Sequence, residues 1–297
     1  MDQRNIKTNV IIPWHIEQTL HHGWQDWFYN YIEGSSQKIN SDFYPIGVFY
    51  SVSHWNALFA PSLRWLFQLF ERISLWTIVL LFVILLILYF FVPSKSKRFF
   101  RGGIPLAIFT TGFAGMIFDL MLIFTFQSIY GHVFSWIGLL VTSFMAGAAC
   151  GALLVVLAMD RIKDHFRLFA GIELAIICFS IGCLLIVFIP NVNLGRSDAF
   201  FLFRSLFLFI SFISGFLIGS QFPLANKLYL RDDTSLTETA GTLYSVDLLG
   251  GWLGGVLGAV VLLPVLGLAG TCIAVALLKL TSFIVINTQP KAHLRGG

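Results

Sequence analysis

Charged residues are scarce in this sequence of 297 residues. Only 11% of the chain is Asp, Glu, Lys or Arg, whereas 57% is hydrophobic. Soluble domains carry about 25% charged residues, so this composition excludes an ordinary soluble fold and indicates an integral membrane protein. The 31 Phe and 8 Trp residues are typical of surfaces that face lipid tails and the bilayer interface.

The sequence has only four cysteines, and none belongs to a CxxC motif. All four lie in apolar runs, which is typical of buried thiols rather than of a redox pair or a zinc site. These residues are Cys150, Cys178, Cys183 and Cys272. The polar start, Met1–Val10, is not followed by the apolar core of a signal peptide, so we predict no secretory leader.

Sequence signatures of metal and phosphate sites are also missing. His21 and His22 are adjacent and would point to different faces of a helix, and no further ligand follows His15 at a regular spacing. Gly250–Gly255 has neither a preceding strand nor the Lys-Ser/Thr ending of a phosphate-binding loop. We therefore predict no metal site and no cofactor site in this chain, and we expect no nucleic-acid partner.

Long apolar runs are what the sequence does contain. Seven of them reach about the 18–20 residues that a helix needs to cross a bilayer. We therefore predict an all-α integral membrane protein with about seven transmembrane helices in a domain over residues 74–290. The predicted spans are 74–92, 104–128, 133–158, 167–189, 200–224, 241–264 and 269–287.

Glycines at four-residue spacing mark several of these spans, most of all the stretch 241–270. In lipid the backbone must satisfy its own hydrogen bonds, so a helix forms despite the glycines, and GxxxG pairs let a neighbouring backbone approach closely. We predict helix-packing roles for these glycines. They are Gly147, Gly151, Gly215, Gly219, Gly250, Gly251, Gly254, Gly255 and Gly258.

Residues 1–73 are predicted to be an extramembrane or interfacial segment, too short and polar for a core of their own. We expect a helix over 13–33 and an extended segment over 39–50 with a turn at Tyr44-Pro45, because the residue before proline is disfavoured in a helix. Residues 61–72 show apolar residues at helical spacing beside charges. This pattern predicts a helix that lies in the membrane interface.

The distribution of basic residues predicts an orientation. Loops after the first, third and fifth spans and the C-terminal tail hold most of the Lys and Arg residues of the membrane domain, so this side and the C-terminus should be cytoplasmic. Residues 1–73 would then lie outside. The basic residues on the cytoplasmic side are Lys95, Lys97, Arg98, Arg101, Arg161, Lys163, Arg167, Lys227, Arg231, Lys291 and Arg295. The short connections 129–132 and 265–268 predict that the spans on either side of each are antiparallel neighbours.

A few polar residues lie inside predicted spans, where an ionisable group costs at least about 2.5–3.5 kcal/mol at mid-depth. One interpretation is that they line a path for a cationic substrate or a proton. The other is that the lysine neutralises one acid and the set fixes helix register. We favour the second, because no repeated acidic motif or broken helix indicates a pore. The candidate site consists of Asp119, Glu173, Asp247, Lys279 and Gln127.

Three stretches together resemble the membrane-fused spermidine synthase-like family, in which a polyamine aminopropyltransferase-type domain is joined to a multi-spanning domain. They are Gly112–Leu153, with Asp119 where the family usually has Glu, Gly215–Leu228 (GFLIGSQFPLANKL) and Leu243–Leu268. Ile39–Tyr50 is similar to the tail that follows the synthase domain. The resemblance covers most of residues 1–275.

The resemblance implies that the last six spans form a bundle similar to half of a major-facilitator-type transporter. It implies a bacterial inner-membrane protein whose membrane domain anchors, or handles substrate for, an aminopropyltransferase-type domain. No strand–glycine-turn–helix unit for decarboxylated S-adenosylmethionine is present, so no catalytic, cofactor-binding or metal residue is carried over. That cofactor is expected inside the cell, which conflicts with residues 1–73 lying outside, and the sequence leaves the conflict open.

Two alternatives to the anchoring role remain. The chain could be a stand-alone transporter or channel subunit for a polyamine or other small cation, using Asp119, Asp247 and Lys279. It could instead be a structural subunit of a membrane complex, with the glycine faces as docking surfaces. In every case the lipid bilayer is the first expected partner, and a synthase-like domain or another membrane subunit is the second.

Overall fold

The computed structural model describes residues 29–30, 40–41, 44–91, 103–131, 134–185, 197–230 and 236–288. The chain divides into two units, Met1–Ile39 and Asn40–Gly297. In the first unit only Tyr29 and Asn30 are described, so the helix expected over 13–33 otherwise lies outside the described residues. All helices named below belong to the second unit.

The regular elements of the described residues are all helices, apart from one isolated antiparallel bridge between Ser41 and Tyr44. This confirms the all-α prediction for these residues. The elements are α3 (Ile46–Phe59), η2 (Pro61–Leu63), α4 (Arg64–Glu71), α5 (Leu75–Phe91), α6 (Gly103–Tyr130), α7 (Phe134–Ala158), η4 (Met159–Arg161), α8 (His165–Gly182), α9 (Ser197–Tyr229), α10 (Leu236–Leu257), η6 (Gly258–Leu266) and α11 (Gly267–Thr288).

Five helical segments within the described residues are long and apolar enough to cross a membrane. A sixth is added if 61–71 and 75–84, which meet at 86°, count as one bent span. These segments support a membrane protein with five to six candidate spans. They are Gly103–Tyr130, Phe134–Arg161, His165–Leu185, Arg204–Tyr229 and Thr237–Thr288.

The last candidate segment, Thr237–Thr288, has 52 residues, which would measure about 78 Å as one straight helix. Its first arm, α10, runs parallel to α6, since Gly250 lies against Phe109 and Gly258 lies against Ile117. Residue numbers therefore rise together along the two helices.

The second arm, α11, runs antiparallel to the same helix. Cys272 contacts Met121, whereas Lys279, further along α11, contacts Thr111, which comes earlier in α6. The chain therefore turns back between the two arms. Gly267 lies at the turn with a φ of 70°, a left-handed conformation that glycine adopts without the cost of a Cβ clash.

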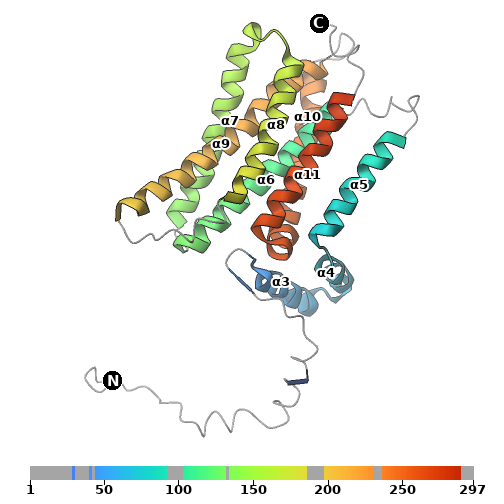
Figure 1. Ribbon diagram of the computed structural model, residues 1–297, viewed down its shortest axis with the longest axis vertical. Coiled ribbons are helices and arrows are strands. Elements are labelled where there is room, and N and C mark those ends of the chain that lie inside the picture. Colours follow the sequence, from blue (N-terminus) through green and yellow to red (C-terminus); the bar gives the residue numbers. More distant parts are fainter. Residues whose placement is uncertain are drawn as a thin grey trace. The chain divides into compact units, whose positions relative to one another are not determined.

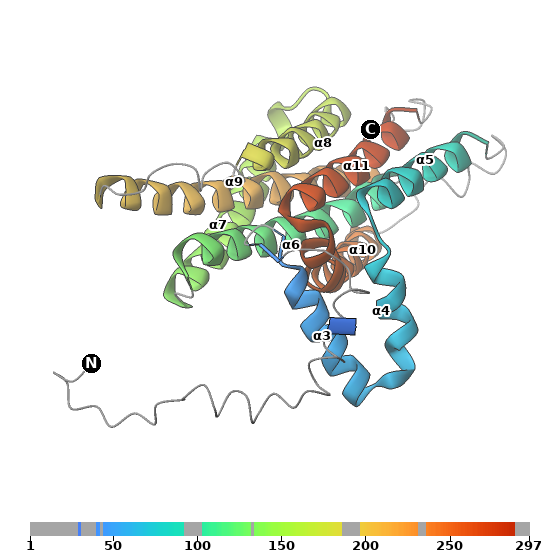
Figure 2. The same ribbon diagram turned by 60° about the horizontal axis from the view of Figure 1, so that its bottom comes forward.

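Helices α7 and α9 form a second parallel pair, and their contact is the most extensive among the described helices. Four glycines lie where their backbones meet, and a Cβ on any of them would overlap a carbonyl group of the opposite helix, such as that of Phe212 or Phe144. Figures 1 and 2 show α7 and α9 crossing closely beside α6 and α8. The four glycines are Gly147, Gly151, Gly215 and Gly219.

The expectation of an extended segment over 39–50 is wrong from Ile46 onward, because α3 begins there. Tyr44 is non-helical, as expected for the residue before a proline. The restriction ends at that residue, however, and Pro45 itself suits a helix start because its missing N–H would have had no partner there. The helix expected over 61–72 is confirmed as η2 and α4.

Two apolar clusters hold the described unit together. The larger one lies among α6, α7, α8, α9, α10 and α11 and includes Phe118, Phe126 and Phe169, each at most 1% exposed. The smaller one packs Ile46 and Phe49 of α3 against η6. Helices α3 and α4 thus lie at one end of the bundle, where the chain turns from α10 to α11 (Figure 1).

A polar cluster between four helices

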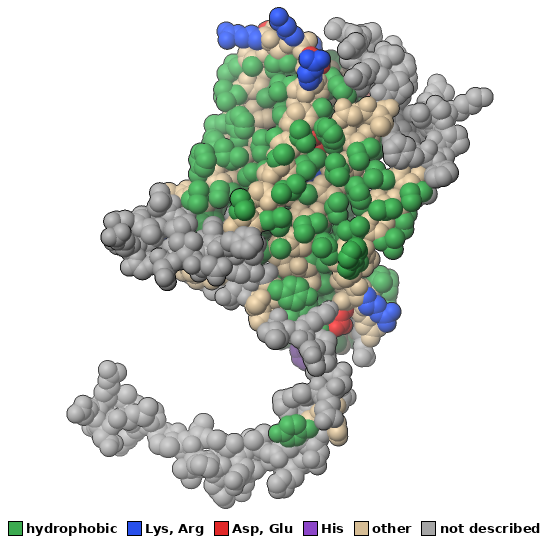
Figure 3. Space-filling model, viewed as in Figure 1, with side chains coloured by type: hydrophobic (Ala, Val, Ile, Leu, Met, Phe, Trp, Pro, Cys, Tyr) green, Lys and Arg blue, Asp and Glu red, His purple; other side chains and the backbone are tan. Residues whose placement is uncertain are grey.

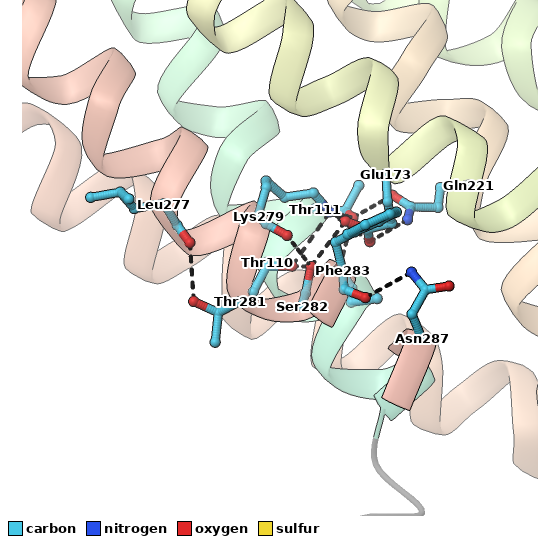
Figure 4. Close-up of polar contacts among 11 residues, drawn as sticks. Thr110, Thr111, Glu173, Gln221, Leu277, Lys279, Thr281, Ser282, Phe283 and Asn287 are labelled. Atoms are coloured by element: carbon cyan, nitrogen blue, oxygen red, sulfur yellow. Dashed lines mark hydrogen bonds and ion pairs between the residues drawn. The ribbon is translucent and has the colours of Figure 1, made fainter. Parts of the chain in front are cut away.

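Lys279 and Glu173 form an ion pair that is completely buried between the helices. Lys279 of α11 lies with its Nζ 2.8 Å from both carboxylate oxygens of Glu173 on α8. Both side chains are 0% exposed. Figure 4 shows them pointing toward each other between α8 and α11.

Two further helices supply partners to this pair. Gln221 of α9 donates from Nε2 to Glu173 Oε1 at 2.6 Å. Thr111 of α6 accepts from Lys279 Nζ at 2.8 Å, and its hydroxyl contacts Gln221 Oε1. The four side chains therefore close a ring that joins α6, α8, α9 and α11 (Figure 4).

Hydroxyl groups complete the cluster. Ser282 lies almost one turn beyond Lys279, and its hydroxyl approaches Glu173 Oε2 and the carbonyl oxygen of Lys279, each at 2.9 Å. Thr110 contributes an oxygen 3.4 Å from Lys279 Nζ. The ammonium and the carboxylate are thus surrounded by partners, as a buried charge pair requires.

This arrangement defines the chemistry of the cluster. One positive and one negative charge cancel, and the carboxylate already accepts bonds from an amine, an amide and a hydroxyl group. An external cation could reach Glu173 only by displacing Lys279. The cluster therefore links the helices and leaves no open position for a ligand at the carboxylate.

The other candidate residues lie elsewhere. Asp119 is also on α6, eight residues after Thr111, which corresponds to about 12 Å of helix rise. It is 8% exposed, and its Oδ1 atom is buried with no hydrogen-bond partner among the described residues. Asp119 thus lies apart from the ion pair along α6.

Asp247 and Gln127 are also separate from the cluster. Asp247 is half-buried on α10, where its backbone and side chain lie directly over Gly112 of α6. Gln127 is half-buried near the C-terminal end of α6, with its carbonyl accepting from Gly131. Of the five candidate residues, the structure brings together only Glu173 and Lys279.

Sequence analysis missed most of the partners. Thr110, Thr111 and Ser282 were not selected, and Gln221 was not placed in the site. A usable signal was present: Ser282 follows Lys279 at a helical spacing of three, and Thr110-Thr111 is a hydroxyl pair inside an apolar span. Neither signal says which helix faces which, so the ring could not be assembled from them.

The described residues contain no group of three or more His, Cys, Asp or Glu side chains that could hold a metal ion. The acids inside these helices, Asp119, Glu173 and Asp247, are distributed over α6, α8 and α10 instead of converging. The cluster around Lys279 contains one carboxylate only, and a lysine ammonium occupies the position that a cation would take.

Comparison with known proteins gives one distant relative. The chain is 21% identical over 206 residues to a protein of Corynebacterium efficiens named polyamine aminopropyltransferase. The aligned part is 68% of this chain and 38% of the relative, so the chain spans well under half the length of the protein that it matches. No protein-family profile and no solved structure matches the chain.

Proposed function

We propose that this chain is the multi-pass membrane domain of a polyamine aminopropyltransferase-like protein. In this proposal it anchors, or handles substrate for, a transferase-type domain that is not part of the chain. The observation that carries the proposal is the alignment, which takes up 68% of a strongly apolar helical chain and only 38% of the relative. The rest of the relative's length leaves room for a separate catalytic domain.

The polar cluster supports a non-catalytic role. Its carboxylate is sealed by Lys279, Gln221 and Ser282 at 0% exposure, so it offers no open position to a substrate amine. Decarboxylated S-adenosylmethionine is assigned only to the transferase-type domain, and a polyamine is the expected substrate class of the complete protein.

The finer membrane architecture is part of this proposal. We propose seven spans, because α10 runs parallel and α11 antiparallel to α6, and α5 packs on α11. The last six would form a bundle similar to half of a major-facilitator-type transporter. The paired glycines would serve as GxxxG packing motifs, and the C-terminus would face the cytoplasm of a bacterial inner membrane.

The first test is the native protein isolated from its source. We expect peptides upstream of Met1, or a stably bound partner, together with transfer of an aminopropyl group from decarboxylated S-adenosylmethionine to a polyamine. Intact mass and peptide mass spectrometry measure the first, and product formation by the purified membrane protein measures the second. A native polypeptide of 33.3 kDa that purifies without any such activity would overturn the proposal.

A second candidate function is cation or proton transport, and one observation favours it. The Oδ1 atom of Asp119 is buried in a candidate span without a hydrogen-bond partner among the described residues. Such a carboxyl group either carries a proton or attracts a cation. Cation flux into vesicles that contain the full chain, abolished by Asp119→Asn or Asp247→Asn, would support this candidate. Flux that survives both substitutions would remove it.

A further inference from the structure

The segment before α5 exposes large apolar side chains on the side away from the bundle. Helices α3 and α4, joined by η2, form a hairpin on which several such residues are exposed. Trp55 and Phe59 stack with ring centroids 5.5 Å apart, so they form one aromatic surface. Four of the exposed residues are Trp55 (57%), Phe59 (77%), Trp65 (63%) and Leu69 (55%).

The opposite side of the hairpin is already in use. Ile46 and Phe49 are 1% exposed and pack against Val261 and Val265 of η6. The hydroxyl group of Tyr50 donates to Glu71 Oε1 at 2.8 Å, which ties α3 to α4. The hairpin is thus fixed to the end of the bundle by its inner side. Its outer apolar face is a separate surface that takes no part in this packing.

The direction of α4 indicates what covers this outer face. The segment 61–71 meets 75–84 of α5 at 86°. Helix α5 is apolar around its whole circumference, which is typical of a helix surrounded by lipid or protein on all sides. With α5 as one of the seven proposed spans, a helix at a right angle to it runs along the membrane plane, at the level where α5 enters.

The start of α5, like the outer face of the hairpin, exposes large apolar side chains. Trp76 is 81% exposed there, and Leu80 follows one turn later on the exposed surface. Tryptophan prefers the headgroup level of a bilayer, because its ring is apolar and its N–H needs a polar partner. Exposed Arg72 between α4 and α5 suits the same level.

We propose that α3, η2 and α4 form an interfacial hairpin that inserts Trp55, Phe59, Trp65 and Leu69 into the boundary between lipid headgroups and acyl chains. The occupant of the outer face is the lipid surface itself, rather than a second copy of the chain or a further domain. The hairpin would brace the turn between α10 and α11 from the membrane surface. This inference does not depend on the transferase-related function.

Site-directed spin labelling of the full chain in bilayer discs tests the proposal. Single cysteines replace Trp55, Phe59, Trp65 or Leu69 in a chain whose native cysteines are changed to alanine. Two reference positions on one segment calibrate the measurement: Leu153, exposed on α7 within a candidate span, and Asp160, exposed in η4. His54→Cys, exposed on α3 and about 100° around the helix from Trp55, is the matched control.

We expect labels at the four positions to collide more often with oxygen than with a water-soluble nickel chelate, as at Leu153. His54 should shift toward the values of Asp160. Water-like values at all four positions would overturn the proposal. Immobile labels that neither reagent reaches would also overturn it, because a protein surface would then cover the face. Each labelled chain is first compared with the unlabelled chain by thermal unfolding, and at least two positions must retain the native midpoint.

Discussion

At the residue scale the central feature is an ion pair that is wholly removed from solvent. Taking an ammonium and a carboxylate out of water costs several kcal/mol per ion, and the mutual attraction offsets this only when the remaining hydrogen-bonding capacity is used. Here Gln221, Thr111 and Ser282 use it. Because the pair and its partners come from four helices, the cluster also fixes how those helices are rotated against one another.

Replacing one member of the pair should be strongly destabilising. Lys279→Met leaves the carboxylate of Glu173 buried without its counter-ion, and we expect a loss of about 3–5 kcal/mol in the free energy of unfolding. The double variant Lys279→Met with Glu173→Gln should lose less than the sum of the two single variants. Unfolding by SDS in mixed micelles measures all three.

Thr281→Val is the matched control for this cycle. Thr281 lies on α11 between Lys279 and Ser282 and is 9% exposed, and within the described residues its hydroxyl donates to the carbonyl oxygen of Leu277 on its own helix. Its loss should therefore cost less than about 1 kcal/mol. Single variants at Glu173 and Lys279 that are as stable as Thr281→Val would show that the pair does not hold the bundle together.

Substitution of Asp119, in contrast, should change the free energy of unfolding very little. Because its Oδ1 atom accepts no hydrogen bond from the described residues, Asp119→Asn removes no bond at that atom and keeps the shape of the side chain. We expect a change in unfolding free energy within about 0.5 kcal/mol. The same mixed-micelle titration measures it. A loss comparable to that of Lys279→Met would mean that the carboxyl group has an essential partner.

At the element scale the close approach of parallel helices depends on missing side chains. A Cβ at Gly147 would overlap the carbonyl group of Phe212, and one at Gly215 would overlap that of Phe144. These are backbone atoms, so no rotamer change can relieve the clash. Dispersion contacts between such closely packed backbones are a main source of helix association in lipid.

Gly147→Ala should therefore separate α7 from α9. Forcing an extra methyl group into a packed contact costs about 1–3 kcal/mol. Because this clash is with backbone atoms, we expect a cost toward the upper end of that range. Gly138→Ala is the control on the same helix, because nothing lies within 4 Å of a Cβ there. Thermal unfolding in detergent compares the two. Equal midpoints would contradict the packing role of Gly147.

Sequence patterns predict most of the membrane helices but not which side chains meet between them. Apolar length predicts α6, α7 and α8 well because each span must satisfy its backbone bonds internally, whatever surrounds it. The pairing of Lys279 with Glu173 was not predictable, since it depends on the rotation of α11 against α8. The start of α3 at Ile46 was missed because proline restricts the residue before it and leaves those after it free to form a helix.

At the scale of the whole unit, the two ends of the bundle differ in their charge and in the elements that they contain. The α10–α11 turn, α3 and the start of α5 share one end. The opposite end holds the turn between α7 and α8, with Arg161, Lys163 and Arg167 exposed. Figure 3 shows Lys and Arg side chains gathered at that end and a broad apolar surface below it. The proposed orientation, with the basic α7–α8 turn in the cytoplasm, rests on the positive-inside rule and can be measured.

Cysteine labelling in intact cells tests this orientation. With the native cysteines replaced, Ser41→Cys should react with a membrane-impermeant maleimide, because residue 41 is exposed and precedes the hairpin on the outer side. Asp160→Cys, exposed at the basic end, should react only after the cells are permeabilised. The reverse pattern would place the hairpin side in the cytoplasm. It would also remove the conflict with a cytoplasmic cofactor, since a transferase-type domain preceding this segment would then meet decarboxylated S-adenosylmethionine where that cofactor is expected.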